Sequence, residues 1–314
     1  MAAEGTLTRG AHWRVGVASD PGLQRSLNED RVFADGSRGV FLVVDGLGGH
    51  AAGETAAETA VQVLQERLAG LNGEADLEHE IRDAISAANN EIYQLAQEHK
   101  ECAGMACVLT LAVARDDRVT VGHVGDSRLY LAWNGELRKL TSDHSPVGEQ
   151  EDNHELTEEE AMNHPRRNEV YRDVGSQVHL ADDPEFVETK SFLFRPDAAL
   201  LLCSDGLSDV LTSAQISSIV ERYEGDAGWI AQELVDAANR AGGKDNVSVV
   251  FVAGPEFVGR SAEGGLKAAR QRHSVTRIRQ DSRRWRPLFR NLALLLIGML
   301  LGVALWIGIQ RFWP

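Results

Sequence analysis

Apolar residues are grouped along residues 12–253 in blocks of two kinds. Short runs rich in valine, leucine and isoleucine, bounded by polar or glycine-containing turns, predict β-strands. Six such runs are Val40–Val44, Leu109–Ala114, Arg118–His123, Leu129–Trp133, Ala199–Cys203 and Val247–Val252.

Longer segments between these runs carry apolar residues at helical spacing. The pattern predicts helices over Glu54–Ala69, over Leu77–Gln97 and from about Ala227 to Ala241. The second begins after Asp76, a residue that commonly caps helices. One of its faces carries the apolar residues Ile81, Ile85, Ala88, Ile92 and Leu95. The main domain is therefore expected to contain both strands and helices.

The chain turns polar and acidic between residues 145 and 176. A capping box formed by Thr157 and Glu160 predicts one short helix there. Because the segment has too few apolar residues for a core of its own, we expect a flap on the surface of the domain.

The C-terminal segment is apolar on every side. Leu292–Ile309 is an uncharged run of 18 residues, which at ~1.5 Å per residue nearly spans a bilayer core. Trp285, Phe289, Phe312 and Trp313 flank it as aromatic residues do at membrane interfaces. A buried core helix is the alternative, and the all-round apolar surface disfavours it. We therefore predict a single-pass membrane anchor.

The charge distribution gives this anchor an orientation. Ten basic residues and two acidic ones lie between Arg260 and Arg290, whereas the whole chain has 32 Lys and Arg against 47 Asp and Glu. Because basic flanks stay on the cytoplasmic side, the main domain is expected at the membrane but in the cytoplasm. Its acidity would repel the nucleic-acid backbone, so we expect no nucleic-acid partner.

These patterns divide the chain into five parts. They are an N-terminal tail (1–11), a main domain (12–254) with the flap at about 145–176, a basic juxtamembrane linker (255–290), a transmembrane helix (291–310) and a short tail (311–314). The three cysteines form no CxxC pair, which argues against a disulfide framework or a zinc ribbon.

Four aspartates lie at the ends of predicted strands. Asp45, Asp126 and Asp205 each follow an apolar run, and Asp245 precedes one. A single acid at such a position is ordinarily a turn former. Four of them, together with Glu29, favour an all-oxygen site for Mg²⁺ or Mn²⁺ if the sheets bring them together.

Such a site indicates phosphoryl chemistry. Two ions lower the pKa of a shared water and neutralise charge on the phosphoryl oxygens, so that the resulting hydroxide can attack phosphorus. Arg25 lies four residues before Glu29 and could bind the phosphate through its two-pronged guanidinium. The residues alone therefore support a metal-dependent phosphoryl hydrolase.

The order and spelling of the polar segments add a resemblance. RSLNED (25–30), VVDGLGGHAAGE (43–54), GHVGDSRLYL (122–131), LTSDHS (140–145), CSDGLSD (203–209) and KDNVSVV (244–250) resemble the signature segments of the metal-dependent protein phosphatases, the type 2C serine/threonine phosphatases. The DGxGGH spelling and His164–Asn168 are similar to bacterial members. The resemblance covers about residues 12–253.

The resemblance implies an α+β fold: a four-layer α-β-β-α sandwich with two central antiparallel sheets. It implies that Asp45 bridges two metals and that Gly46 offers its backbone carbonyl. Glu29, Asp205 and Asp245 match further metal ligands. Asp126 matches a ligand, shared with Asp205, of a weaker third metal site. Arg25 matches the phosphate-binding arginine.

The implied activity is hydrolysis of phosphoserine and phosphothreonine in proteins, with Mn²⁺ or Mg²⁺ as the cofactor. The partners would then be phosphorylated proteins and a counteracting serine/threonine kinase. Leu47 stands where many eukaryotic relatives have a histidine proposed as general acid, and Met105 stands in a segment usually spelled Gly-Thr-Thr. These departures leave one alternative open, a catalytically weak, membrane-anchored binding protein of the same fold. A further alternative is a two-metal hydrolase of small phosphoesters or nucleotides.

Overall fold

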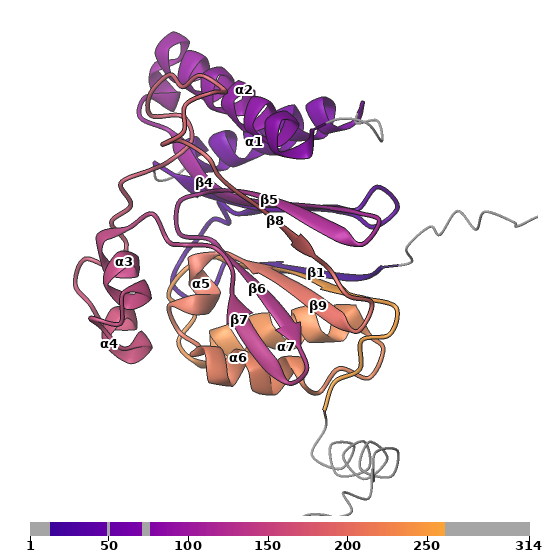
Figure 1. The fold of residues 1–314 in the computed structure, drawn as a ribbon. Helices are drawn as coiled ribbons and strands as arrows, with labels where there is room; N and C mark the ends of the chain where they lie inside the picture. Colours follow the sequence, from indigo (N-terminus) through magenta and orange to yellow (C-terminus); the bar gives the residue numbers. More distant parts are fainter. Residues whose placement is uncertain (1–12, 49–50, 71–75, 261–314) are drawn as a thin grey trace, which may run out of the picture. The chain divides into compact units, whose positions relative to one another are not determined.

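The computed structural model describes residues 13–48, 51–70 and 76–260, and the strands in these residues form two antiparallel five-stranded sheets (Figure 1). The first sheet has the order β1 (Arg14–Asp20), β10 (Val247–Ala253), β9 (Ala198–Cys203), β6 (Arg128–Trp133) and β7 (Glu136–Lys139). The second has the order β2 (Arg31–Asp35), β3 (Val40–Leu47), β4 (Ala106–Arg115), β5 (Arg118–Val124) and β8 (Glu188–Leu193).

Helices cover the outer faces of both sheets. The second sheet carries α1 (Ala51–Leu68) and α2 (Leu77–Glu98), and the first carries α6 (Ser213–Val220) and α7 (Ala227–Arg240) (Figure 1). The short α5 (Asp205–Ser208) follows β9 directly, and a 3-10 turn occupies Lys100–Cys102. In the flap lie α3 (Pro146–Asp152) and α4 (Glu158–Met162). The result is the four-layer arrangement of helices, two sheets and helices.

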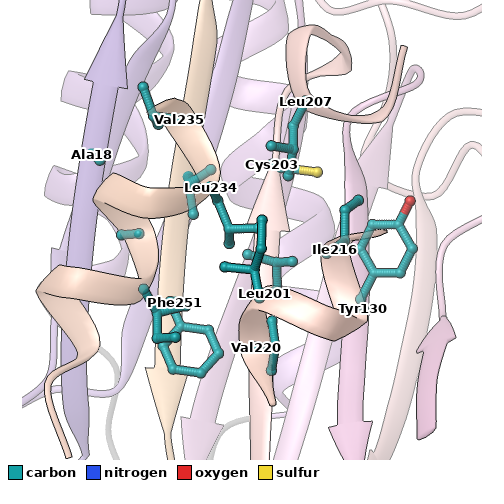
Figure 2. Packing of buried hydrophobic residues seen from close by; sticks show 14 of the residues in the cluster. Ala18, Tyr130, Leu201, Cys203, Leu207, Ile216, Val220, Leu234, Val235 and Phe251 are labelled. Atoms are coloured by element: carbon teal, nitrogen blue, oxygen red, sulfur yellow. The ribbon is translucent and has the colours of Figure 1, made fainter. Parts of the chain in front are cut away.

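The layered packing explains why the interior strands are continuously apolar. Along β3, Phe41 and Val43 pack between the two sheets, whereas Leu42 and Val44 pack beneath α1 and α2. Alternate residues of a strand point to opposite faces, so a strand covered on both sides needs apolar residues at every position. Figure 2 shows the corresponding packing beneath α6 and α7, where Leu201 of β9 lies among the helix side chains.

The six predicted strands are all confirmed, and they are the six interior strands of the two sheets. The three predicted helices are confirmed as α1, α2 and α7, and Asp76 accepts hydrogen bonds from the backbone N–H groups of Glu78 and His79. The capping box of Thr157 and Glu160 is present at the start of α4. The strands that sequence patterns did not identify are β1, β2, β7 and β8, the four edges of the sheets.

No helix among residues 13–48, 51–70 and 76–260 is long and apolar enough to cross a membrane. The predicted N-terminal tail, the transmembrane helix at 291–310, the short tail at 311–314 and nearly all of the basic linker lie outside the described residues. The predicted sandwich of two antiparallel sheets is confirmed. The membrane anchor stays a prediction.

Candidate metal centre

Strand ends from both sheets meet at one pocket of about 180 Å³. Asp45 lies near the end of β3, Asp126 in the turn between β5 and β6, and Asp205 at the start of α5. Asp245 lies two residues before β10. The residues that sequence reasoning singled out all line this pocket: Arg25, Glu29, Asp45, Gly46, Asp126, Asp205 and Asp245. Five separate parts of the chain thus converge on one site.

Asn246 holds the segment that carries Glu29 beside Asp245. Its side-chain amide nitrogen donates to the backbone carbonyls of Pro21 and Leu27 at 2.9 and 2.8 Å. Its Oδ1 accepts the backbone N–H of Glu29 at 2.8 Å. Sequence reasoning missed this role, although Asn246 stands in the quoted KDN segment beside a predicted ligand.

Two glycines of the site are required by close backbone approach. A Cβ at Gly46 would lie 2.2 Å from the carbonyl oxygen of Gly53, and one at Gly206 would lie 1.9 Å from that of Asn246. Distances this short exclude any side chain unless the backbone shifts. The glycines after Asp45 and Asp205 therefore let neighbouring segments reach the pocket.

We expect Gly206→Ala to lower the free energy of unfolding by roughly 1–3 kcal/mol. The added methyl group must displace the backbone of Asn246, which positions Glu29. Chemical denaturation of the metal-free protein measures the effect. Gly70→Ala is the control, because a Cβ there meets nothing within 4 Å. Equal midpoints for both variants would show that the site tolerates a side chain at residue 206.

Asp30 is the most deeply buried acid beside the pocket, with only 2% of its surface exposed. The hydroxyl of Ser204 donates to its Oδ2 at 2.8 Å. Burial raises the pKa of Asp30 to about 6, and the charge of Asp245 acts in the same direction. The sequence interpretation named Glu29 and passed over Asp30, because adjacent acids cannot be ranked by burial without the structure.

Burial and mutual repulsion raise the pKa values of the central carboxyls. Burial is the largest cause for Asp45 and Asp205, whose pKa values are raised well above the usual range, and the neighbouring aspartates add to it. The same two causes raise the pKa of Asp126 to about 7. Acids arranged in this way are unfavourable for folding unless a cation compensates their charge.

The donor set fits hard divalent cations. Every charged ligand candidate in the pocket is a carboxylate, and no histidine or cysteine is among the described residues that line it. The Oδ1 of Asp205 is buried and has no hydrogen-bond partner among the described residues, which leaves a carboxylate oxygen available for a metal. Oxygen-only sites of this kind favour Mg²⁺ and Mn²⁺.

Arg25 and Asp245, predicted for phosphate and metal respectively, contact each other. The guanidinium Nη2 of Arg25 lies 2.7 Å from Oδ2 of Asp245. The side chain of Arg25 is 48% exposed, so it can turn toward a phosphate without crossing the protein interior. The contact places the positive charge of Arg25 at the rim of the acidic pocket.

A second, smaller cavity of about 20 Å³ adjoins the site on the side of the flap. Asp126 and Asp205 line it together with Asp209 and the flap residue Arg167. The guanidinium of Arg167 lies 2.7 Å from Oδ2 of Asp209. Sequence reasoning did not single out this ion pair, because spacing in the sequence gives no sign that residues 42 positions apart would meet.

Known proteins resemble the chain in both sequence and structure. The family model described as protein phosphatase 2C matches residues 24–234. The "Serine/threonine phosphatase stp" of Listeria monocytogenes is 36% identical over 241 residues, which cover 74% of this chain and 93% of that protein.

Two solved phosphatase structures also match. The serine/threonine phosphatase PstP/Ppp of Mycobacterium tuberculosis has a TM-score of 0.69 at 32% identity, covering 77% of this chain and 98% of the other. The catalytic domain of PstP in complex with two manganese ions has a TM-score of 0.68 at 31% identity, covering 77% and 97%. The chain therefore belongs to the protein phosphatase 2C family of metal-dependent serine/threonine phosphatases.

Proposed function

We propose that this phosphatase removes phosphate from phosphoserine and phosphothreonine in proteins at the pocket lined by Arg25, Asp45 and Asp205. One observation carries the proposal: the residues expected from separate sequence segments line a single pocket. The likeness to proteins named serine/threonine phosphatases supports the substrate class.

Asp45, Asp205, Asp245 and Glu29 would hold two Mn²⁺ or Mg²⁺ ions, with the carbonyl of Gly46 as a further ligand. Asp126 would share a weaker third site with Asp205. When bound, the ions activate water for attack on phosphorus and offset charge on the phosphoryl oxygens. Arg25 would orient the phosphoryl group, since it is the only basic residue among the described residues that line the pocket.

None of the described residues that line the pocket is a histidine that could protonate the leaving group. Leu47 lines it where many eukaryotic relatives have that histidine, and Val170 of the flap adds a second apolar side chain. The serine or threonine alkoxide would then take its proton from water. Asn168 of the flap lines the pocket as well. The protein part of the substrate would therefore contact the flap.

Phosphate release from a phosphothreonine peptide tests the proposal. The full chain, purified in a mild detergent, would be assayed with Mn²⁺, with Mg²⁺ and with EDTA. We expect release that depends on either ion and stops with EDTA. A folded protein that binds Mn²⁺ but releases nothing from any phosphopeptide would instead favour the catalytically weak binding protein, or a hydrolase of small phosphoesters if p-nitrophenyl phosphate is cleaved.

Arg25→Ala is expected to lower kcat/KM for the phosphopeptide by roughly 10- to 100-fold, because a charge-assisted contact to phosphate is worth about 1.5–3 kcal/mol. Its stability should change little, since exposed ion pairs contribute little. Arg25→Lys should recover part of the loss, because lysine keeps the charge but not the two-pronged geometry. Steady-state kinetics and thermal melts measure both effects. Unchanged kinetics for Arg25→Ala would remove Arg25 from the phosphate site.

The C-terminal run Leu292–Ile309 would anchor the protein in a membrane, with the phosphatase domain in the cytoplasm. Its length, its flanking aromatic residues and the basic excess before it support this. A membrane-bound serine/threonine kinase would be the natural counterpart, because anchoring both raises their effective concentration. Fractionation tests the anchor: the full chain should remain with membranes after alkaline extraction, and a chain ending at residue 260 should be released.

A further inference from the structure

The loop that carries Arg25 exposes two leucine side chains. Residues 21–30 connect β1 to β2, and within them Leu23 is 68% exposed and Leu27 is 45% exposed. A single exposed leucine is ordinary on a protein surface. These two, however, stand two residues before and two residues after the arginine at the rim of the metal pocket.

The start of the loop is held against the segment before Asp245. The backbone N–H groups of Leu23 and Gln24 donate to the carbonyl of Gly243 at 2.8 and 3.2 Å. The side chain of Leu23 lies over the same glycine, because a Cβ at residue 243 would come 2.7 Å from its Cγ. Since residue 243 is two positions before Asp245, Leu23 is tied to the side of the pocket where Arg25 pairs with that aspartate.

Asn246 ties the loop on both sides of Arg25. Its side-chain nitrogen binds the carbonyls of Pro21 and Leu27, and Asn246 itself lines the pocket. The backbone that carries the two leucines is therefore fixed relative to the pocket. A ligand that contacts the leucines meets a loop that is already ordered, which reduces the entropic cost of binding.

Neither leucine is among the described residues that line the metal pocket. Consecutive Cα atoms are about 3.8 Å apart, so residues two positions apart are separated by at most about 7 Å. The backbone of each leucine lies within that distance of Arg25. In a bound phosphopeptide, the residues one or two positions from the phosphothreonine lie within the same distance of it. The leucines are thus placed for the flanking residues of a substrate and not for its phosphate.

The chemistry of the two side chains favours an apolar occupant. An apolar side chain that covers them removes apolar surface from water, which is favourable in proportion to the area buried. A polar side chain in the same place would lose water without gaining a hydrogen bond from leucine. Leu47 and Val170, which line the pocket, offer no polar side-chain group either.

We propose that Leu23 and Leu27 form an apolar rim that selects phosphopeptides with an apolar side chain within two residues of the phosphoserine or phosphothreonine. The inference rests on the proposed function, in which Arg25 binds the phosphate and so places the flanking residues over this loop. The two leucines act on the choice of substrate and not on the reaction at phosphorus. The rim narrows the substrates from phosphoproteins in general to those with apolar flanks.

Three phosphothreonine peptides of equal length and net charge test the rim. They carry leucine, alanine or serine at the two positions on each side of the phosphothreonine. The full chain in mild detergent, with Mn²⁺, would be assayed for kcat/KM on each peptide. Fluorescence anisotropy would give the dissociation constants of matching peptides that carry a non-hydrolysable phosphonate. The readout is the ratio between the leucine and serine peptides, because a change at the metals or at Arg25 alters both peptides alike.

We expect the wild type to prefer the leucine peptide over the serine peptide roughly tenfold in kcat/KM and in affinity, which corresponds to burial of about two methylene groups. The ratio should fall toward onefold in the double variant Leu23→Gln/Leu27→Gln, because glutamine has a polar end. The double variant Leu23→Met/Leu27→Met should keep the ratio. Leu193→Gln is the matched control, because Leu193 is 61% exposed at the end of β8 and does not line the metal pocket.

The outcomes distinguish the rim from the proposed function. A ratio near onefold in a wild type that cleaves both peptides would overturn the rim alone. So would a ratio that the glutamine double variant leaves unchanged, or that Leu193→Gln lowers equally. A wild type that binds the phosphonate peptides with the expected ratio but releases no phosphate would refute the proposed function and support the rim. If the leucines instead cover a second copy of the chain, sedimentation would show a dimer that the glutamine double variant dissociates while the ratio stays the same, and the proposal would be wrong.

Discussion

Asp45→Asn is expected to reduce phosphate release by roughly a thousandfold or more and, at the same time, to stabilise the metal-free protein. A loss of that size corresponds to about 4 kcal/mol of transition-state stabilisation, which is within what a metal site supplies. The gain in stability has a separate cause. Burial, followed by the charges of four neighbouring aspartates, raises the pKa of Asp45 well above its usual range, so its ionised form is unfavourable without a cation.

Opposite effects on activity and stability are the mark of a residue selected for binding a metal. Steady-state assays with Mn²⁺ and thermal melts in EDTA measure the two effects, and we expect the melting temperature to rise by about 2–4 °C for each kcal/mol gained. Asp83→Asn is the control, because Asp83 lies on an exposed face of α2 and pairs with Arg67 at 3.2 Å. A destabilised metal-free Asp45→Asn with normal activity would contradict both the ligand role and the repulsion.

The two sheets could be predicted from the sequence only where they are covered on both faces. All six predicted strands are interior strands. In two of them, β9 and β10, every residue is buried. The four edge strands were missed for a physical reason: they are only half covered. In β8, for example, no residue is fully buried, and hydrogen bonding to β5 defines the strand. Edge strands depend on backbone pairing, which leaves little trace in composition.

The site was more predictable than the elements around it. Asp45, Asp205 and Asp245, the residues that we propose bind metal, are visible in the sequence as acids beside apolar strands, and the structure brings all three to one pocket. Residues that act by positioning are different. Asn246 acts through the backbone of a segment far away in the sequence, and spacing along the chain does not show which segment an amide will reach.

Mn²⁺ is expected to raise the melting temperature of the phosphatase by roughly 5–10 °C at pH 7.5 and by little at pH 5. At a concentration one hundred times its dissociation constant, a ligand adds about 2.7 kcal/mol, and each kcal/mol shifts the melting temperature of a domain of this size by about 2–4 °C. The pH dependence comes from the carboxyls. Protons compete with the cation, because burial raises the pKa values of Asp126 to about 7 and of Asp30 to about 6.

The sign follows from proton binding in the two states. Between pH 4 and 7 the folded, metal-free protein holds protons on these carboxyls that the unfolded chain has lost, so their contribution to stability falls as the pH rises through that range. Bound Mn²⁺ compensates the negative charge and removes this loss. Other groups, such as His123, whose pKa burial lowers to about 4, titrate alike with and without the metal. Melts recorded with Mn²⁺ and with EDTA at each pH therefore isolate the site. In Asp126→Asn the metal-free protein should lose less stability than the wild type as the pH rises. If Mn²⁺ raises the melting temperature of the wild type as much at pH 5 as at pH 7.5, protons and cations do not compete for these carboxylate oxygens.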